Sequence, residues 1–144
     1  MSFRFGASIN KFSNLVHQIN KAIIMKQEAI SIRPFIGAKN FDESRNFYQD
    51  IGFTEVVLSP ALSLFTWGEL GFYLQNYYQQ DWVDNTMIFF QVKNTALVYE
   101  ELAALDLSKK YSSARLLPIR DENWGRECFL HDPSGVLLHF GEFF

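Results

Sequence analysis

The distribution of hydrophobic and polar residues predicts a strand, a helix and three more strands between residues 31 and 77. The helix begins near Asn40 or Asp42, either of which can cap it, and it ends at Gly52. Its buried face is predicted to contain Phe41, Ser44, Phe47, Tyr48 and Ile51. The predicted strands are residues 31–38, 53–59, 62–67 and 72–77.

The same order of elements begins again after a polar connection at residues 79–85. A strand is predicted at 86–92, and Asn94 can cap a second helix. A strand at 112–118 and an irregular segment at 119–124 follow. The buried stripe of this second helix is predicted at Leu97, Val98, Glu101, Leu102 and Leu105.

The chain ends in a predicted β-hairpin at residues 124–140, whose turn is Asp132-Pro133-Ser134-Gly135. Asp at the first position can accept a hydrogen bond from the backbone two residues on, and Pro and Gly suit the later positions. The flanking strands are apolar enough to predict that both of their faces are covered. His139 is the polar exception deep in the second strand.

The two halves of the chain align with each other. An offset of 54 residues places Phe35 on Phe89, Asn40 on Asn94 and Ile51 on Leu105. In the closing strands, residues 71–75 align with 135–139, so that Gln75 falls on His139. This degenerate duplication predicts two equivalent modules whose inward-facing residues converge on one cavity.

Residues 1–28 differ from the rest and predict an amphipathic helical extension. It would dock on the domain at 29–144 or on a partner subunit. A membrane anchor is disfavoured because its polar face carries Asn, Gln and Ser rather than basic residues. No secretory signal is evident. The apolar positions are Phe12, Leu15, Val16, Ile19, Ala22 and Ile23.

The composition of the 144 residues is that of one globular domain, with 48% hydrophobic and 20% charged residues. A net charge of -3 gives no electrostatic case for binding nucleic acid or an anionic membrane. The 15 Phe, 6 Tyr and 3 Trp suit either a Phe-rich core or an apolar ligand cavity. The single cysteine, Cys128, excludes an internal disulfide and a cysteine-rich zinc site, and we expect a cytoplasmic protein.

From about Ile30 onward the chain resembles the vicinal oxygen chelate superfamily, which includes glyoxalase I, bleomycin-resistance proteins and extradiol dioxygenases. The motifs that carry the resemblance are residues 40–53, a helix that leads into Gly52-Phe53, and the closing hairpin at 132–140. The resemblance implies an α+β fold of two paired βαβββ modules, about residues 30–78 and 86–144. These would form a curved sheet or barrel around a cavity, and the protein would be a homodimer.

Catalytic members of this superfamily hold a divalent metal at four inward positions, which correspond here to Arg33, Gln75, Met87 and His139. Arginine has no lone pair to donate, and a methionine thioether is too soft for the usual metals. Only His139 and Gln75 remain as possible metal ligands, which is too few for a catalytic site. We therefore expect no metal cofactor.

These observations predict a protein that binds a small aromatic or anionic molecule in a metal-independent cavity, as in sequestration or antibiotic resistance. Arg33 would meet the ligand or pair with Glu127 or Glu142. No catalytic residue is predicted, and Cys128 is expected to be a buried, inert thiol. The alternatives are a glyoxalase-like lyase or dioxygenase-like enzyme with misassigned ligands, or an interaction module with a collapsed pocket. The predicted ligand-binding residues are Arg33, Phe35, Trp67, Tyr73, Gln75, Phe89, Trp124 and His139.

Overall fold

The computed structural model describes residues 13, 14 and 27–144. The chain divides into two units, Met1–Ser31 and Ile32–Phe144, and the second unit is described here. The predicted N-terminal helix lies outside the described residues, apart from Ser13 and Asn14. In the part of the chain that the structure describes, no helix is long and apolar enough to cross a membrane.

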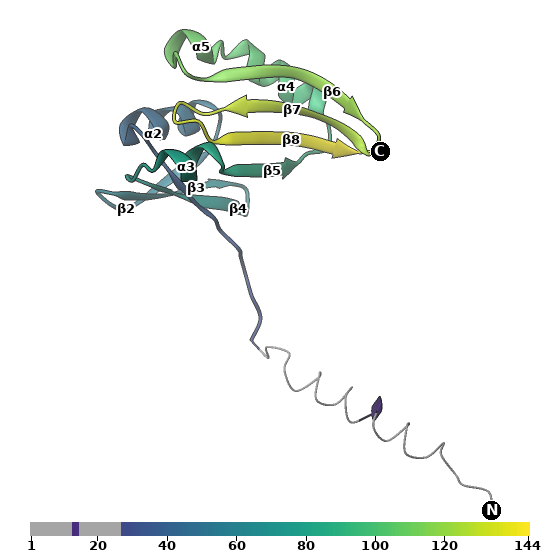
Figure 1. Cartoon of the computed structure of the whole chain (residues 1–144), viewed down its shortest axis with the longest axis horizontal. Coiled ribbons are helices and arrows are strands. Elements are labelled where there is room, and N and C mark those ends of the chain that lie inside the picture. The colour runs from purple at the N-terminus through teal and green to yellow at the C-terminus, as the bar shows by residue number, and fades with distance from the viewer. Residues whose placement is uncertain (1–12, 15–26) are drawn as a thin grey trace, which may run out of the picture. The chain divides into compact units, whose positions relative to one another are not determined.

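The first module has the predicted order of a strand, a helix and three strands (Figure 1). Strand β1 pairs parallel with β4, and the other neighbours are antiparallel, which gives the sheet order β1-β4-β3-β2. Helix α2 lies along one face of this sheet. The elements are β1 (Phe35–Gly37), α2 (Phe41–Asp50), β2 (Thr54–Ser59), β3 (Leu62–Trp67) and β4 (Leu70–Gln75).

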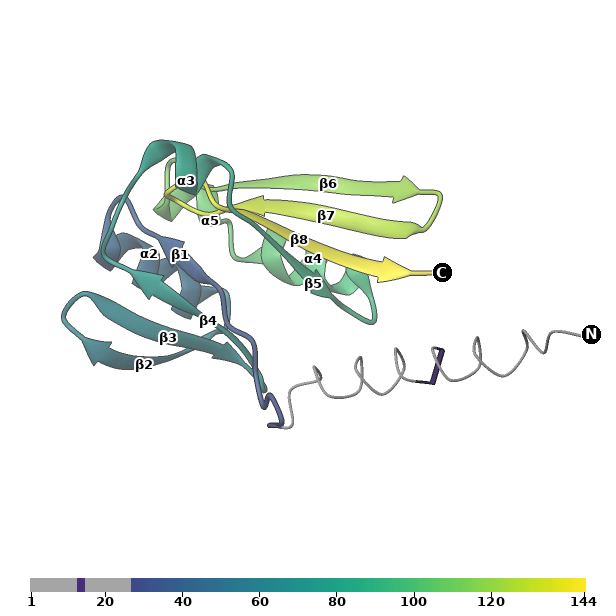
Figure 2. The same ribbon diagram turned by 60° about the horizontal axis from the view of Figure 1, so that its bottom comes forward.

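The second module repeats this topology with the sheet order β5-β8-β7-β6, in which β5 is parallel to β8. The α+β fold of two paired modules is therefore confirmed. The two sheets are curved and remain separate four-stranded sheets, so they do not close into a barrel (Figure 2). The elements are β5 (Met87–Gln91), α4 (Thr95–Ala104), β6 (Arg115–Glu122), β7 (Gly125–His131) and β8 (Leu137–Phe143).

The ends of the two main helices confirm the duplication. The side chain of Asn40 accepts a hydrogen bond from the Glu43 backbone N–H at 3.1 Å, and that of Asn94 accepts one from Leu97 N–H at 2.9 Å. The C-cap residues that follow the two helices, Ile51 and Leu105, are also equivalent. Both modules therefore use the same N-cap chemistry at positions 54 residues apart.

Several predicted boundaries were wrong. Strand β1 is shorter than 31–38, and β6 includes residues 119–122, which were predicted to be irregular. A register shift between Leu117 and Arg120 disturbs the β6 ladder, which explains why the sequence pattern there looked irregular. Two short helices, α3 (Gln80–Asp84) and α5 (Leu107–Lys110), were not predicted because so few residues show no helical periodicity.

The predicted buried stripe of α2 is confirmed for Phe41, Ser44, Phe47 and Tyr48, with Ile51 partly buried, whereas that of α4 was only partly correct. In α4, Leu102 is buried, whereas Leu97 and Leu105 are about half exposed and Glu101 is exposed. Val98 and Tyr99 are partly buried against the core, and Thr95 near the start of the helix is buried. The predicted stripe was too wide because it followed hydrophobicity, while only part of the helix surface faces the sheet.

The two modules pack against each other through their helix-covered faces. Phe53, just after α2, contacts Phe90 of β5 with a ring-centroid distance of 5.7 Å. Trp67 at the end of β3 lies 6.3 Å from Phe140 of β8. These aromatic contacts join the two halves into one core.

The Asp132–Gly135 turn holds the modules together with hydrogen bonds. Asp132 Oδ1 accepts from the backbone N–H groups of Ser134, Gly135 and Val136 at 2.8–2.9 Å, as the turn chemistry predicted. Its other oxygen accepts from the hydroxyl of Tyr48 on α2 at 2.8 Å. Gly135 has φ of +111°, which few side chains tolerate. The turn of the second module is thus tied to the helix of the first.

Replacing Tyr48 with phenylalanine should lower the free energy of unfolding by about 1–3 kcal/mol, because a buried carboxylate loses a hydrogen-bond donor. Urea unfolding measures the change. Tyr99→Phe is the matched control, since no hydrogen bond from the Tyr99 hydroxyl to another described residue is present. Equal stabilities of the two variants would contradict the role of the Tyr48–Asp132 bond.

Burial raises the pKa of Asp132 to about 6, although four hydrogen bonds favour its charged form. The folded protein therefore binds this proton more tightly than the unfolded chain, in which the pKa is near 3.8. The contribution of Asp132 to the free energy of unfolding is therefore greatest below pH 4. It decreases by up to about 3 kcal/mol as the pH rises to about 6.

This pH dependence can be measured by unfolding the native protein and Asp132→Asn between pH 4 and 7. Other titrating groups are common to both proteins, so the difference between the two curves reports Asp132. A difference that does not change with pH would show that the carboxyl is ionised throughout this range.

Candidate functional site

Each sheet has one face covered by a helix and one open face. In β4, Phe72 and Leu74 are buried on the side of α2, and Tyr73 between them lies on the opposite face. In the closing hairpin, Cys128, Leu130 and Leu138 are buried in the same way. On the opposite face Glu127 is buried and Phe129 and His139 are partly buried, so the prediction that both faces of this hairpin are covered is only partly correct within residues 27–144.

A row of apolar side chains crosses the open face of the first sheet. Successive ladder pairs join Val56 to Leu64, Leu64 to Tyr73, and Tyr73 to Phe35. The rings of Phe35 and Tyr73 are 4.7 Å apart, and Phe35 is 49% exposed. We call these four residues the tyrosine row.

A corresponding row crosses the open face of the second sheet. It joins Leu117, Phe129, His139 and Phe89, which we call the histidine row. The imidazole of His139 lies 4.8 Å from the ring of Phe129 and 6.0 Å from that of Phe89. Trp124 extends the aromatic surface, with its ring 6.0 Å from Phe89.

The comparison of the two rows corrects the alignment of the closing strands. Because Phe35 corresponds to Phe89, their ladder partners Tyr73 and His139 are equivalent. Gln75 pairs with Gly37 and corresponds to Gly141, not to His139 as the sequence alignment indicated. Gln75 still lies on the open face, two residues beyond Tyr73 on β4.

A carboxylate fixes the orientation of His139. Nδ1 of His139 lies 3.1 Å from Oε2 of Glu127, a residue of β7 that is only 9% exposed. With Nδ1 directed at a carboxylate, Nδ1 carries a proton and Nε2 is the nitrogen that can meet a ligand. The sequence analysis missed this pair. The register of the hairpin could have predicted this pair, because it places Phe129 opposite His139 and Glu127 diagonally next to it.

Arg33 precedes β1 and pairs with neither of the acids proposed for it. Glu127 bonds to His139, and Glu142 accepts from the backbone N–H of Thr95 at 3.1 Å. Nε of Arg33 is buried and has no hydrogen-bond partner among the described residues. The alternative that Arg33 forms an ion pair with Glu127 or Glu142 is therefore wrong within the described residues.

Trp67 was also placed wrongly. It was expected to face the cavity, but it lies on the helix-covered side, where its ring contacts Phe53, Phe90 and Phe140. It remains 42% exposed because it borders an apolar groove beside α4. The error arose because Trp67 is at the end of its strand, where the sequence gives no indication of the face.

The predicted site residues fall into two groups on separate sheets. Phe35, Tyr73 and Gln75 lie on the first open face, and Phe89, His139 and Trp124 lie on or beside the second. Within residues 27–144 no aromatic contact joins the groups, since the modules meet through their opposite faces. A single chain therefore does not bring these residues together around one cavity.

The donor set at His139 does not fit a catalytic metal. Glu127 is hydrogen-bonded to His139. Together the two residues would supply two protein ligands, whereas catalytic zinc sites use about three. No cluster of three His, Cys, Asp or Glu side chains suited to a metal occurs among the described residues. Cys128 is buried, and burial raises the pKa of its thiol to about 11, so it is not a nucleophile at neutral pH.

No protein-family model and no curated protein sequence matches this chain. Solved structures do match. The bleomycin-binding protein from Streptomyces verticillus, solved with copper(II)-bleomycin, has a TM-score of 0.68 and 21% identity over 79% of this chain and 96% of that chain. An antibiotic-binding protein from a Streptomyces species has a TM-score of 0.62 and 12% identity, over 82% and 100% of the two chains.

Lactoylglutathione lyase from Agrobacterium tumefaciens is also similar, with a TM-score of 0.55 and 17% identity over 80% of this chain and 95% of that chain. At such low identities the similarity shows the fold alone. The two motifs at residues 40–53 and 132–140 correctly predicted it: the chain has the paired-module fold of the glyoxalase and bleomycin-resistance proteins.

Proposed function

We propose that the protein binds and sequesters a small aromatic or anionic molecule at the histidine row, without a metal. The observation that carries the proposal is the exposed aromatic surface around an oriented histidine. Phe89 and Trp124 are 44% and 38% exposed, and beside them His139 is held by Glu127. Rings in contact with solvent suit stacking on a planar ligand, and Nε2 of His139 can fix its orientation.

Similar structures support sequestration as the type of function. Two of them are described as bleomycin-binding and antibiotic-binding proteins. The fold also occurs in a lyase, so it does not by itself choose between binding and catalysis. The residues around His139 favour binding, because they provide rings and hydrogen-bonding groups but no metal-ligand set.

We also propose that two copies of the chain form a homodimer that completes the cavity. Both rows have exposed apolar residues at their ends within the described part of the chain. Val56 is 48% exposed and Leu117 is 40% exposed. Contiguous apolar surface of this kind is typical of an interface or a ligand site. Placing the tyrosine row of one copy opposite the histidine row of another would enclose a ligand between Phe35 and Phe89.

In such a cavity the polar groups would act as orienting contacts. Nε2 of His139 and the amide of Gln75 offer hydrogen bonds. Arg33, whose Nε has no hydrogen-bond partner in the part of the chain that the structure describes, would attract a carboxylate, phenolate or carbonyl oxygen. Stacking would supply most of the affinity, and these polar groups would select among aromatic ligands.

The dimer can be tested with Val56→Lys, which places a charge in the tyrosine row. Light scattering should show that the native protein is a dimer and that this variant is largely monomeric. Val57→Lys is a matched control, because Val57 is 58% exposed and its ladder partner is Ser63, on the helix-covered side. A monomeric native protein would contradict the proposed assembly.

Ligand binding can be tested by screening small aromatic and anionic compounds by thermal shift, followed by titration of tryptophan fluorescence. Phe89→Ala should weaken binding of the best compound by about tenfold or more, because it removes a stacking surface. Leu97→Ala is the control, since Leu97 is 51% exposed but lies on α4. Affinity should be unchanged by a chelator. Stoichiometric iron, nickel, manganese or zinc in the purified protein would favour the lyase or dioxygenase alternative.

A further inference from the structure

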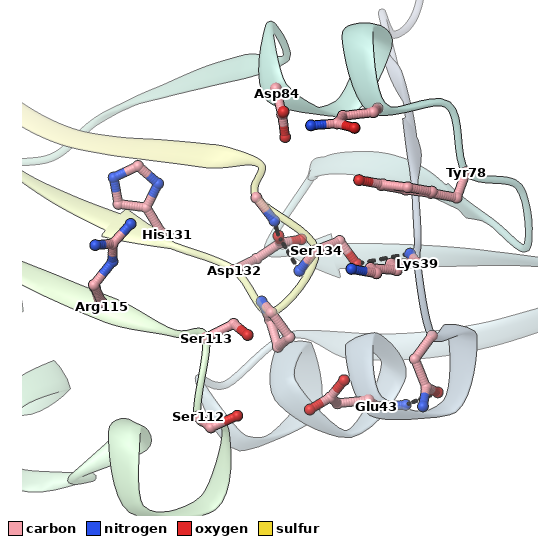
Figure 3. A pocket seen from close by; sticks show the side chains of 14 residues that line it. Lys39, Glu43, Tyr78, Asp84, Ser112, Ser113, Arg115, His131, Asp132 and Ser134 are labelled. Atoms are coloured by element: carbon pink, nitrogen blue, oxygen red, sulfur yellow. Dashed lines mark hydrogen bonds between the residues drawn. The ribbon is translucent and has the colours of Figure 1, made fainter.

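A polar cleft lies at the end of the second sheet, next to the Asp132–Gly135 turn (Figure 3). Its volume is about 580 Å³, and it is bordered by the start of β6, the loop before it, α3 and the residues that lead into α2. The proposed function does not use this cleft. Its walls carry charged and hydroxyl-bearing side chains, in contrast to the aromatic rows.

One wall of the cleft is cationic. Arg115 is the first residue of β6 and pairs in the ladder with His131, the last residue of β7. Figure 3 shows their side chains next to each other. Burial and the neighbouring Arg115 charge lower the pKa of His131. Arg115 forms no ion pair with any described residue, so its charge is free for a ligand.

Hydroxyl groups extend this cationic wall. Ser112 and Ser113 lie in the loop just before Arg115 and border the same cleft. A guanidinium beside hydroxyl donors is a suitable environment for a carboxylate. On the far side, Lys39 lies against the ring of Tyr78, with Nζ 5.7 Å from its centroid.

The cleft also carries acidic groups that limit what it can bind. Asp84 at the end of α3 and Glu43 in α2 both border it, and neither forms an ion pair among the described residues. The Asp84 carboxylate lies close to the turn, since a Cβ added to Gly135 would be 3.0 Å from its Oδ1. Asp132 beneath the turn already accepts four hydrogen bonds. A simple polyanion would therefore be repelled.

We propose that this cleft binds a small zwitterion of the free amino-acid class, with its carboxylate at Arg115 and its ammonium group at Asp84. A ligand with both charges would complement Arg115 and Asp84 at the same time, whereas a simple anion or cation would complement only one of them. The volume suffices for a molecule of this size together with water.

The experiment titrates the full chain with glycine, β-alanine and γ-aminobutyrate, which carry the same two charges at increasing separation. Acetate and methylammonium serve as single-charge probes. Binding is followed by NMR through the His131 side chain and the amides of the turn. At least one zwitterion should bind about tenfold more tightly than acetate. No saturable shift with any zwitterion, or equal affinity for acetate, would overturn the proposal.

Two variants assign the roles of the charged residues. Arg115→Gln should weaken both zwitterion and acetate binding by about tenfold, whereas Asp84→Asn should reduce the zwitterion to the affinity of acetate. Both side chains are exposed and form no ion pair with another described residue, so the fold should not change. Arg120→Gln, on the same strand, is the control and should bind normally. Equal losses in Arg115→Gln and Arg120→Gln would show a nonspecific charge effect and overturn the proposal.

Phe89→Ala distinguishes this site from the proposed aromatic site. It should leave zwitterion binding unchanged, because Phe89 lies outside the cleft. A loss of zwitterion binding in this variant would show that the probes bind at the histidine row and would contradict the assignment to the cleft.

Discussion

The buried carboxylate of Asp132 fixes the geometry on which both open faces depend. Three backbone N–H groups of its own turn and the hydroxyl of Tyr48 donate to it, so one side chain closes the hairpin and joins it to the other module. Closing the hairpin in this register places Phe129 opposite His139. A slip of β8 by one residue against β7 would turn His139 toward the core and bring Leu138 to the open face.

The helix caps and the turn could be predicted from the sequence because each depends on residues close together in the chain. Asn40 and Asn94 cap helices by bonds to residues three positions on, and Asp132 bonds within its own turn. The order of elements follows from hydrophobic periodicity in the same way. Together these local features were sufficient to identify the fold.

The candidate site was harder to predict because it depends on strand pairing. The Glu127–His139 pair and the equivalence of Tyr73 with His139 are set by ladder registers, which the sequence does not state directly. The separation of the site residues onto two sheets also depends on how the modules pack, and that is decided by contacts such as Phe53 with Phe90.

The equivalence of Tyr73 and His139 has a consequence for the number and polarity of ligand sites. In a twofold dimer of the proposed kind, each contact between copies joins a tyrosine row to a histidine row, so two identical cavities form. Each cavity has a phenol on one wall and an imidazole on the other. A ligand would therefore have one preferred direction in each cavity, although both walls come from modules of the same topology.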